Sequence, residues 1–296
     1  MTSGPQHDPV DLIFDAGDEL GEGVTWDAAH RRLISVDIMR GRVHLVDPET
    51  GDARTIEVGQ PVGAAVPYRR DALMVAVRDG FARLDLDTGR LTFVAHVELD
   101  KPGQRMNDGA CDAAGRFWAG TMCMQERPGL GALYRLDPDG STHTMIAGVS
   151  ISNGIDWSPD QSRMYYVDSP TQRIDVFDFE PIDGAISNRR ALAGIDAADG
   201  SPDGLTVDAE GAIWLALWGG AAIRRYLPDG RLDRVVHLPV THPTTCAFGG
   251  PDLTDLFITS ATIRLSEAER RAQPLAGAIL RYRPGVSGRA AHAYAG

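Results

Sequence analysis

Residues 201–218 read SPDGLTVDAEGAIWLALW, and this stretch carries the pattern from which the fold is predicted. An acidic residue and a glycine open a short alternating strand at 204–207, which ends in a tight turn rich in Asp and Gly. An apolar strand follows at 213–217. Three other segments have the same construction, with Glu22, Asn107 and Asn153 in the place of Asp203.

The unit built on this pattern occurs six times. With the start of the first strand as the anchor, the anchors lie at Glu22, Val62, Asn107, Asn153, Asp203 and Thr244. Their spacing of roughly 40–50 residues is that of four-stranded propeller blades. A third strand with period-2 alternation aligns in every unit, at 43–48, 81–85, 133–138, 174–178, 223–226 and 279–282. The sequence therefore predicts an all-β six-bladed β-propeller with four-stranded antiparallel blades, whose first strands line the central axis.

The two ends of the chain bear on how this ring closes. The last unit lacks an outer strand, and the run DLIF at 11–14 is expected to supply it, which removes exposed sheet edges. Residues 266–273 are expected to form a short helical insertion. A β-sandwich or two smaller β domains are the competing folds, but no linker or composition shift divides the chain. We expect a single domain over 1–296, with the propeller at 10–285 and residues 1–9 disordered.

Asp-Gly and Asn-Gly are common turn signals, so the anchor segments could be turns and nothing more. Their phase, which is their position relative to the strands of the unit, argues against this reading. The PDG sequences at 138–140 and 228–230 follow a third strand and predict outer turns, whereas PDG at 202–204 precedes a first strand. In a propeller, a residue that precedes a first strand lies at the mouth of the axial channel. Glu22, Asn107 and Asn153 share this phase.

The side chains at this phase favour a divalent cation. Glu22 and Asp203 bring two negative charges, Asn153 adds a neutral oxygen, and Asn107 reaches the metal directly or through water. Hard oxygens suit Ca²⁺ or Mg²⁺, and no His or Cys shares the phase, which disfavours a closed zinc site. Few protein ligands leave room for water and substrate, as in a catalytic metal site.

Composition narrows the class of partner. The formal net charge is −12, which disfavours nucleic acid and anionic membranes and leaves small molecules or metal cations. Cys111, Cys123 and Cys246 contain no CxxC pair and are expected to be buried thiols. The polar N-terminus lacks the features of a signal peptide, and no apolar run is long enough to span a membrane. A cytoplasmic protein is expected; the oligomeric state is left open, and a monomer is compatible with these features.

The segments LGEGVTW (20–26), RMNDGACDAAGRFWAGTM (105–122), SNGIDWSPD (152–160) and SPDGLTVDAEGAIWLALWGG (201–220) together resemble the SMP-30/gluconolactonase/luciferin-regenerating-enzyme-like family, which includes regucalcin. The resemblance extends from about Leu20 to Tyr282 in all six units. The late segments resemble the sugar-acid lactonase branch. The resemblance implies a six-bladed propeller with one divalent metal at the channel mouth, bound by Glu22, Asn153 and Asp203. Ca²⁺ is expected first, with Zn²⁺, Mg²⁺ and Mn²⁺ as alternatives.

The resemblance also implies sugar contacts at Arg105 and Asn107 and the hydrolysis of an aldonolactone, such as glucono-, xylono- or arabinonolactone. Relatives of the regucalcin type have a substrate-contacting Glu after the GTM motif; this chain has Gln125 at the matching spacing, followed by Glu126. Gln125 is therefore the expected contact. Asp203 is the candidate general base that takes a proton from the attacking water.

Three rival functions remain open at this point. The same metal could serve an organophosphate hydrolase or another ester hydrolase. A non-catalytic propeller that binds Ca²⁺ or a partner protein is also compatible, because a fold does not imply a function. A propeller resembling strictosidine synthase is disfavoured by the oxygen-bearing triad, since such a protein would use a catalytic acid without a metal.

Overall fold

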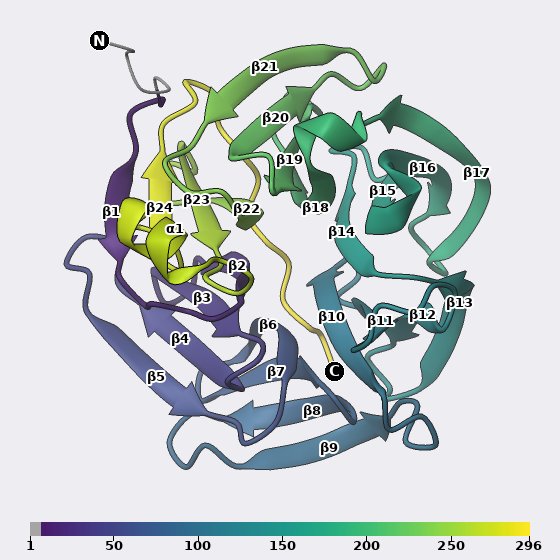
Figure 1. Cartoon of the computed structure of the whole chain (residues 1–296). Coiled ribbons are helices and arrows are strands. Elements are labelled where there is room, and N and C mark those ends of the chain that lie inside the picture. The colour runs from purple at the N-terminus through teal and green to yellow at the C-terminus, as the bar shows by residue number, and fades with distance from the viewer. Residues whose placement is uncertain (1–6) are drawn as a thin grey trace, which may run out of the picture.

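The computed structural model describes residues 7–296. Six four-stranded antiparallel sheets form a ring around one axis (Figure 1). In five of them the strands follow chain order from the axis outward. The first three blades contain β2 (Gly21–Asp27), β3 (Arg32–Asp37), β4 (Arg42–Val46) and β5 (Ala53–Glu57); β6 (Val62–Arg69), β7 (Ala72–Val77), β8 (Gly80–Asp85) and β9 (Leu91–His96); and β10 (Gln104–Cys111), β11 (Phe117–Cys123), β12 (Gly131–Leu136) and β13 (Thr142–Val149).

The fourth and fifth blades repeat this plan and add two short 3-10 helices. They contain β14 (Ser152–Trp157), β15 (Arg163–Asp168), η1 (Ser169–Thr171), β16 (Arg173–Glu180) and β17 (Ala185–Gly194), then η2 (Ala197–Asp199), β18 (Ser201–Val207), β19 (Ile213–Trp218), β20 (Ala222–Tyr226) and β21 (Leu232–His237). The predicted six-bladed propeller with four-stranded blades is confirmed.

The sixth blade is closed by the N-terminal strand, as predicted. It contains β22 (Pro243–Gly249), β23 (Asp255–Ser260) and β24 (Ile279–Tyr282), and β1 (Asp11–Phe14) pairs antiparallel with β24 at its outer edge. The side chain of Arg281 donates to Asp11 at 3.0 Å across this closure. The helical insertion is α1 (Glu267–Ala272), which begins with a capping box between Ser266 and Glu269.

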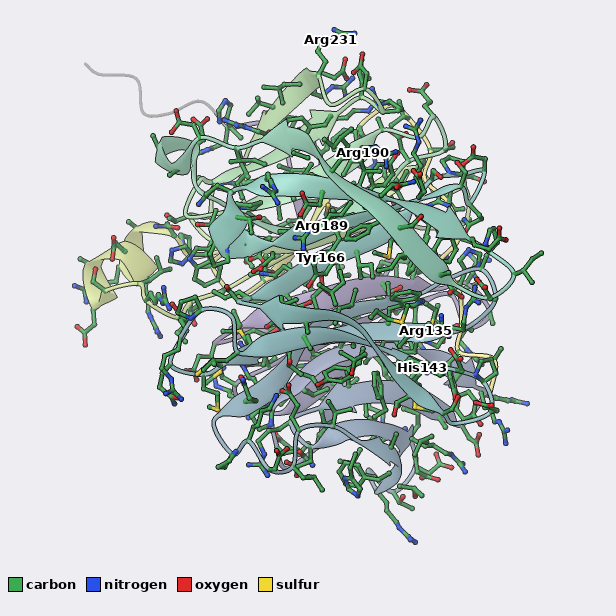
Figure 2. All side chains as sticks on the ribbon, turned by 90° about the vertical axis from the view of Figure 1, so that its right-hand side faces the viewer. Arg135, His143, Tyr166, Arg189, Arg190 and Arg231 are labelled. Carbon is green, nitrogen blue, oxygen red and sulfur yellow. The ribbon has the colours of Figure 1, made fainter. Side chains whose placement is uncertain are left out.

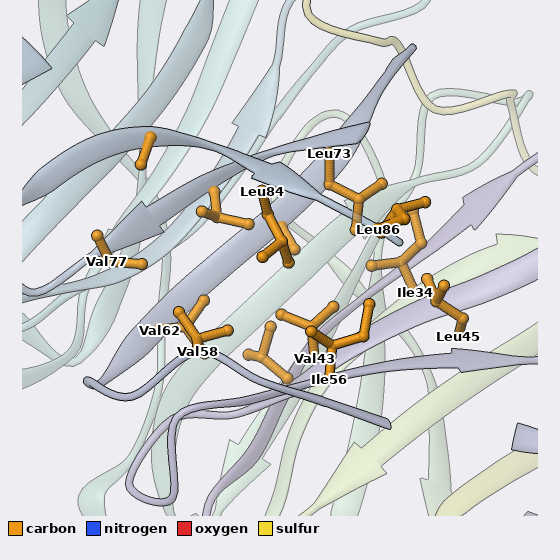
Figure 3. Packing of buried hydrophobic residues seen from close by; sticks show 14 of the residues in the cluster. Ile34, Val43, Leu45, Ile56, Val58, Val62, Leu73, Val77, Leu84 and Leu86 are labelled. Carbon is orange, nitrogen blue, oxygen red and sulfur yellow. The ribbon is translucent and has the colours of Figure 1, made fainter. Parts of the chain in front are cut away.

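Apolar interfaces between neighbouring blades form the core. The second and third strands of each blade supply most of the buried side chains. Figure 3 shows the cluster between blades one and two, which includes Ile34, Val43, Leu45, Ile56, Val58, Val62, Leu73, Val77, Leu84 and Leu86. Outer strands carry charge instead, such as the exposed Arg190 on β17. Figure 2 shows Arg231, directly before β21, at the upper edge of the molecule. Tyr166, on the second strand of blade four, is fully buried. This arrangement buries the apolar faces between blades and leaves the axis free for polar groups.

Two blades fix the turn after the inner strand with the same buried contact. The carboxylate of Asp112 accepts a hydrogen bond from the Trp118 indole at 2.9 Å, and Asp208 accepts one from Trp214 at 2.9 Å. In both cases the tryptophan lies six residues after the aspartate. The repeated Asp-x-x-Gly-x-x-Trp sequence therefore has a structural role that is distinct from the anchor residues.

The C-terminal segment 283–296 crosses the far end of the axis (Figure 1). It bonds to blades five, six, four, two and three in turn. The bonds join Ser287 O to Ala209 N–H, Gly288 N–H to Leu253 O, Arg289 Nη2 to Trp157 O, Tyr294 N–H to Pro67 O and Ala295 N–H to Gly115 O. A cavity of about 90 Å³ remains between this segment and the inner strands, lined in part by Asp108, Asp156 and His292.

Three other expectations concern the chain as a whole. Of the stretch 1–9 that was expected to be disordered, residues 1–6 lie outside the described residues, while Asp8 donates its backbone N–H to His237 O at 2.9 Å. All three cysteines are buried and free, as expected. Within residues 7–296, no helix has both the length and the apolar character needed to cross a membrane.

Replacement of Tyr294 by Ala should lower the free energy of unfolding by about 3 kcal/mol, because a buried aromatic ring is removed. Tyr294 is 4% exposed, and its hydroxyl donates to Asp137 O at 2.9 Å. Urea denaturation followed by circular dichroism measures the change. Ile182→Ala is the control, since Ile182 is 90% exposed and its loss should change stability by less than about 0.5 kcal/mol. Equal effects of the two substitutions would show that the C-terminal segment does not stabilise the ring.

Candidate functional site

The four polar anchors come together in one pocket. Glu22 on β2, Asn107 on β10, Asn153 on β14 and Asp203 on β18 are each 4–5% exposed. They line a pocket of about 460 Å³ at the mouth of the axis, together with Arg105. The other two blades present Val62 and Thr244 at this position, both fully buried.

Irregular pairing of the inner strands determines where these side chains lie along the propeller axis. Each inner strand breaks register with the second strand of its blade in a bulge that includes the anchor or directly follows it. A β-bulge redirects side chains and is common next to active sites. The anchors are therefore part of a bulged strand, and the Gly that follows most of them is not a hairpin turn.

Two of these glycines allow neighbouring inner strands to approach closely. A Cβ at Gly154 would lie 2.7 Å from the carbonyl oxygen of Asp203, and a Cβ at Gly204 would overlap the side chain of Thr245. Only glycine leaves room for such contact. The glycine after one anchor thus packs against the inner strand of the next blade, either at the anchor of that blade or at the residue next to it. This contact brings the anchor side chains of successive blades together.

A chain of hydrogen bonds orients the two amides. Arg105 donates to Asn107 Oδ1 at 2.6 Å, and Asn107 Nδ2 donates to Asn153 Oδ1 at 2.6 Å. Asn153 Nδ2 donates to Ser169 Oγ at 2.7 Å. The Ser169 hydroxyl uses its own hydrogen on Pro202 O at 2.7 Å, so it can only accept from Asn153. This direction turns the carbonyl oxygen of Asn153 toward the Asn107 side of the pocket.

Sequence reasoning missed two residues that support this network. Ser169 lies in η1, directly after the second strand of blade four, and its Ser-Pro sequence reads as an ordinary turn. Tyr166 lies on β15, and its hydroxyl donates to Ser152 Oγ at 2.7 Å. The backbone oxygen of Ser152 in turn accepts from Asn107 Nδ2 at 2.7 Å. Both residues act through other side chains, so no motif marks them.

The pocket walls are mostly apolar. They are formed by Leu20, Met39, Met122, Met124, Ile151, Pro170, Trp218 and Ile263. Trp218 stacks on His242 with ring centroids 4.2 Å apart and planes at 6°. Glu126 and Arg264 complete the rim. Gln125, the expected substrate contact, is not among the lining residues of this described pocket; its Oε1 lies 3.4 Å from Cys123 Sγ.

Comparison with known proteins agrees with this architecture. Residues 20–262 match the SMP-30/Gluconolactonase/LRE-like region. The chain belongs to this family. Regucalcin of Xenopus laevis is 36% identical over 294 residues, which cover 97% of this chain and 98% of that protein. The Bacillus subtilis protein named "Putative sugar lactone lactonase YvrE" is 37% identical over 273 residues, which cover 91% of this chain and 94% of that protein.

Solved structures of the family have the same shape. The crystal structure of regucalcin from Agrobacterium tumefaciens, named a calcium-binding protein, aligns with a TM-score of 0.92 at 30% identity and covers 97% of each chain. A luciferin-regenerating enzyme aligns with a TM-score of 0.87 at 30% identity, over 94% of this chain and 96% of that one. The predicted family membership is confirmed.

Burial dominates the electrostatics of the site in this SMP-30/gluconolactonase/LRE-like protein. It raises the pKa of Glu22 to about 8, with repulsion from Asp108 as the next cause. Burial also raises the pKa of Asp203 well above its usual range, and the charge of Glu22 adds to this shift. The pKa of Asp108 is raised to about 6, again by burial. Burial lowers the pKa of Arg105 to about 10.

The donor set fits a divalent cation. Two buried carboxylates repel each other, and the one buried guanidinium beside them supplies a single positive charge. Within residues 7–296, no cluster of three His, Cys, Asp or Glu side chains has the geometry of a metal site. The candidate set is two carboxylates and an oriented amide oxygen, which are the ligands of a hard cation. A divalent ion would stabilise the ionised form of both carboxylates.

In the metal-free protein, stability should fall as the pH rises from about 5 to about 8. The Glu22 carboxyl ionises near its ordinary pKa of 4.5 in the unfolded chain but near 8 in the folded one, so the folded state holds the proton longer. Glu22→Gln removes this difference and should raise the free energy of unfolding at pH 8 by on the order of 2 kcal/mol.

Urea denaturation with a chelator, at pH 5 and at pH 8, measures the effect. Glu57→Gln on β5 is the matched control, because the Glu57 side chain is 64% exposed and its stability profile should follow that of the parent protein. A parallel decline in all three proteins would contradict the raised pKa of Glu22.

Proposed function

We propose that this chain hydrolyses a sugar lactone to the aldonic acid with the help of one divalent cation, Ca²⁺ in the first place. One observation carries the proposal: two buried carboxylates, an oriented amide and a buried Arg from four different blades line one pocket. The names of YvrE and of the regucalcin structure support the substrate class and the metal, respectively. We include in the same proposal a role in carbohydrate metabolism and a location in the cytoplasm.

Glu22, Asn153 and Asp203 would hold the cation, which as a Lewis acid polarises the oxygens bound to it. The Asp203 carboxylate takes a proton from the attacking water. The water oxygen forms a bond to the lactone carbonyl carbon, the bond from that carbon to the ring oxygen breaks, and the proton passes to the ring oxygen, which leaves as a hydroxyl. The carboxylates of Glu22 and Asp203 at the floor of the pocket would therefore balance the charge of the cation, and that of Asp203 would also accept the proton of the attacking water.

Arg105 and Asn107 orient the substrate in different ways. Both amide hydrogens of Asn107 are engaged, one by Ser152 O and one by Asn153 Oδ1. Asn107 therefore acts mainly by positioning its neighbours. Arg105 uses Nη1 for Met106 O and Asn107 Oδ1, which leaves the donors on Nε and Nη2 for sugar oxygens. Positioning of this kind lowers a barrier by several kcal/mol.

A non-catalytic calcium-binding propeller is the second candidate, and the description of the Agrobacterium tumefaciens protein as calcium-binding favours it. It predicts cation binding without turnover of any lactone. Hydrolysis of a phosphotriester or another ester by the same residues is the third. Side-by-side assays of gluconolactone, xylonolactone and a phosphotriester separate all three.

Asp203→Asn and Glu22→Gln should each lower lactonase kcat/KM by at least about 10²-fold, since they remove a proton acceptor or a charge that holds the cation. The assay is a pH-stat titration with gluconolactone and Ca²⁺. Chelation should abolish turnover of the parent protein, and added Ca²⁺ should restore it.

Asp229→Asn is the matched control. Asp229 lies in an identical Pro-Asp-Gly sequence, but in an outer turn, where its carboxylate accepts the backbone N–H of Arg231 at 3.0 Å. This variant should keep full activity. Full activity of Asp203→Asn with an unchanged circular dichroism spectrum would overturn the proposed roles, and binding of Ca²⁺ without turnover by the parent protein would favour the non-catalytic alternative.

A further inference from the structure

An ion pair crosses the mouth of the pocket. The Arg264 guanidinium contacts the Glu126 carboxylate, although the two residues lie 138 positions apart in the sequence. Glu126 belongs to the loop between β11 and β12 in blade three, and Arg264 to the loop between β23 and β24 in blade six. In a six-bladed ring these blades are opposite each other. The pair therefore spans the axis, and both residues line the pocket.

Backbone contacts hold both loops in place. The Glu126 N–H donates to Cys123 O at 2.7 Å, and Ile263 N–H, next to Arg264, donates to Glu19 O at 2.8 Å. Glu126 has φ 54° and Arg264 has φ 68°. Left-handed backbone is uncommon for residues other than glycine, and such conformations concentrate at functional sites. Each loop thus adopts an unfavourable local conformation at the residue that meets the other loop.

The pair lies at the rim and the reacting groups lie at the floor. The side chains of Arg264 and Glu126 are 57% and 44% exposed, whereas Glu22, Asn153 and Asp203 are almost fully buried. The walls between these levels are largely apolar. A lactone whose ester reaches the floor would have its ring between the walls and any further substituent directed at the rim. A second sugar ring there would have to displace the ion pair.

We propose that Arg264, held by Glu126, restricts the substrate to lactones of a single sugar ring by closing the mouth above it. This inference rests on the proposed lactonase function. Because both side chains are about half exposed, solvent screens their attraction. The expected discrimination against a two-ring lactone is therefore about fivefold, which corresponds to about 1 kcal/mol.

The test compares gluconolactone with maltobionolactone, which carries a second glucose on the same lactone. The measured quantity is the ratio of kcat/KM for the two-ring substrate to that for the one-ring substrate. Arg264→Ala should raise this ratio about fivefold over the parent protein. The double variant Glu126→Arg/Arg264→Glu re-forms the pair with exchanged charges and should return the ratio toward the parent value. Added salt should raise the ratio in the parent protein and leave it constant in Arg264→Ala, because salt screens exposed charges.

Arg271→Ala is the matched control. Arg271 lies on α1 in the same loop and pairs with Glu267, but its side chain is 73% exposed and is not among the pocket-lining residues. Its ratio should equal that of the parent protein. If Arg264→Ala hydrolyses gluconolactone and its ratio equals that of the parent protein, the proposed closure of the mouth is overturned but the proposed lactonase function is not. The same conclusion would follow if the double variant with exchanged charges had the ratio of Arg264→Ala. No hydrolysis of either lactone by the parent protein would overturn the proposed function and this inference with it.

Discussion

Close packing of the six inner strands around one axis is the constraint on which the site depends. A side chain at Gly154 or Gly204 would collide with the neighbouring inner strand, so glycine at these positions permits the spacing at which the anchors meet. Each strand also bulges at its anchor. The ring thereby collects oxygens from blades that are distant in sequence, without any helix or long loop to carry them.

This arrangement places repelling carboxylates in a buried pocket, which opposes folding. Burial raises the pKa values of Glu22 and Asp203, and the charge of Arg105 offsets this shift only in part. The apolar interfaces between blades and the C-terminal segment across the far end of the axis supply the compensating stability. Conflict between local stability and chemistry is typical of functional sites.

The sequence predicted the elements that repeat. Six anchors at regular spacing identified the blades, the DLIF run identified β1, and the Ser266 to Gln273 segment identified α1. The phase of Asp203 relative to Asp229 separated an axial residue from an outer turn, although their tripeptides are identical. Repetition works here because each blade places equivalent positions at the same distance from the axis.

Features that depend on contacts between different blades could not be read from one unit. Ser169 is a hydroxyl in a common turn until its bonds to Asn153 and Pro202 are known. Spacing favoured Gln125 as a substrate contact, but a left-handed turn at Glu126 places the latter on the pocket rim, and the role of Gln125 stays a prediction. Residues 286–296 have no strand pattern, and their position across the axis follows from isolated backbone bonds.

One cation is expected to bind where the anchors of blades one, four and five meet. Anomalous diffraction from crystals grown with Mn²⁺ locates such an ion directly. A single strong peak is expected in contact with carboxylate oxygens of Glu22 and Asp203 and with Oδ1 of Asn153. A peak elsewhere on the protein, with none in this pocket, would contradict it.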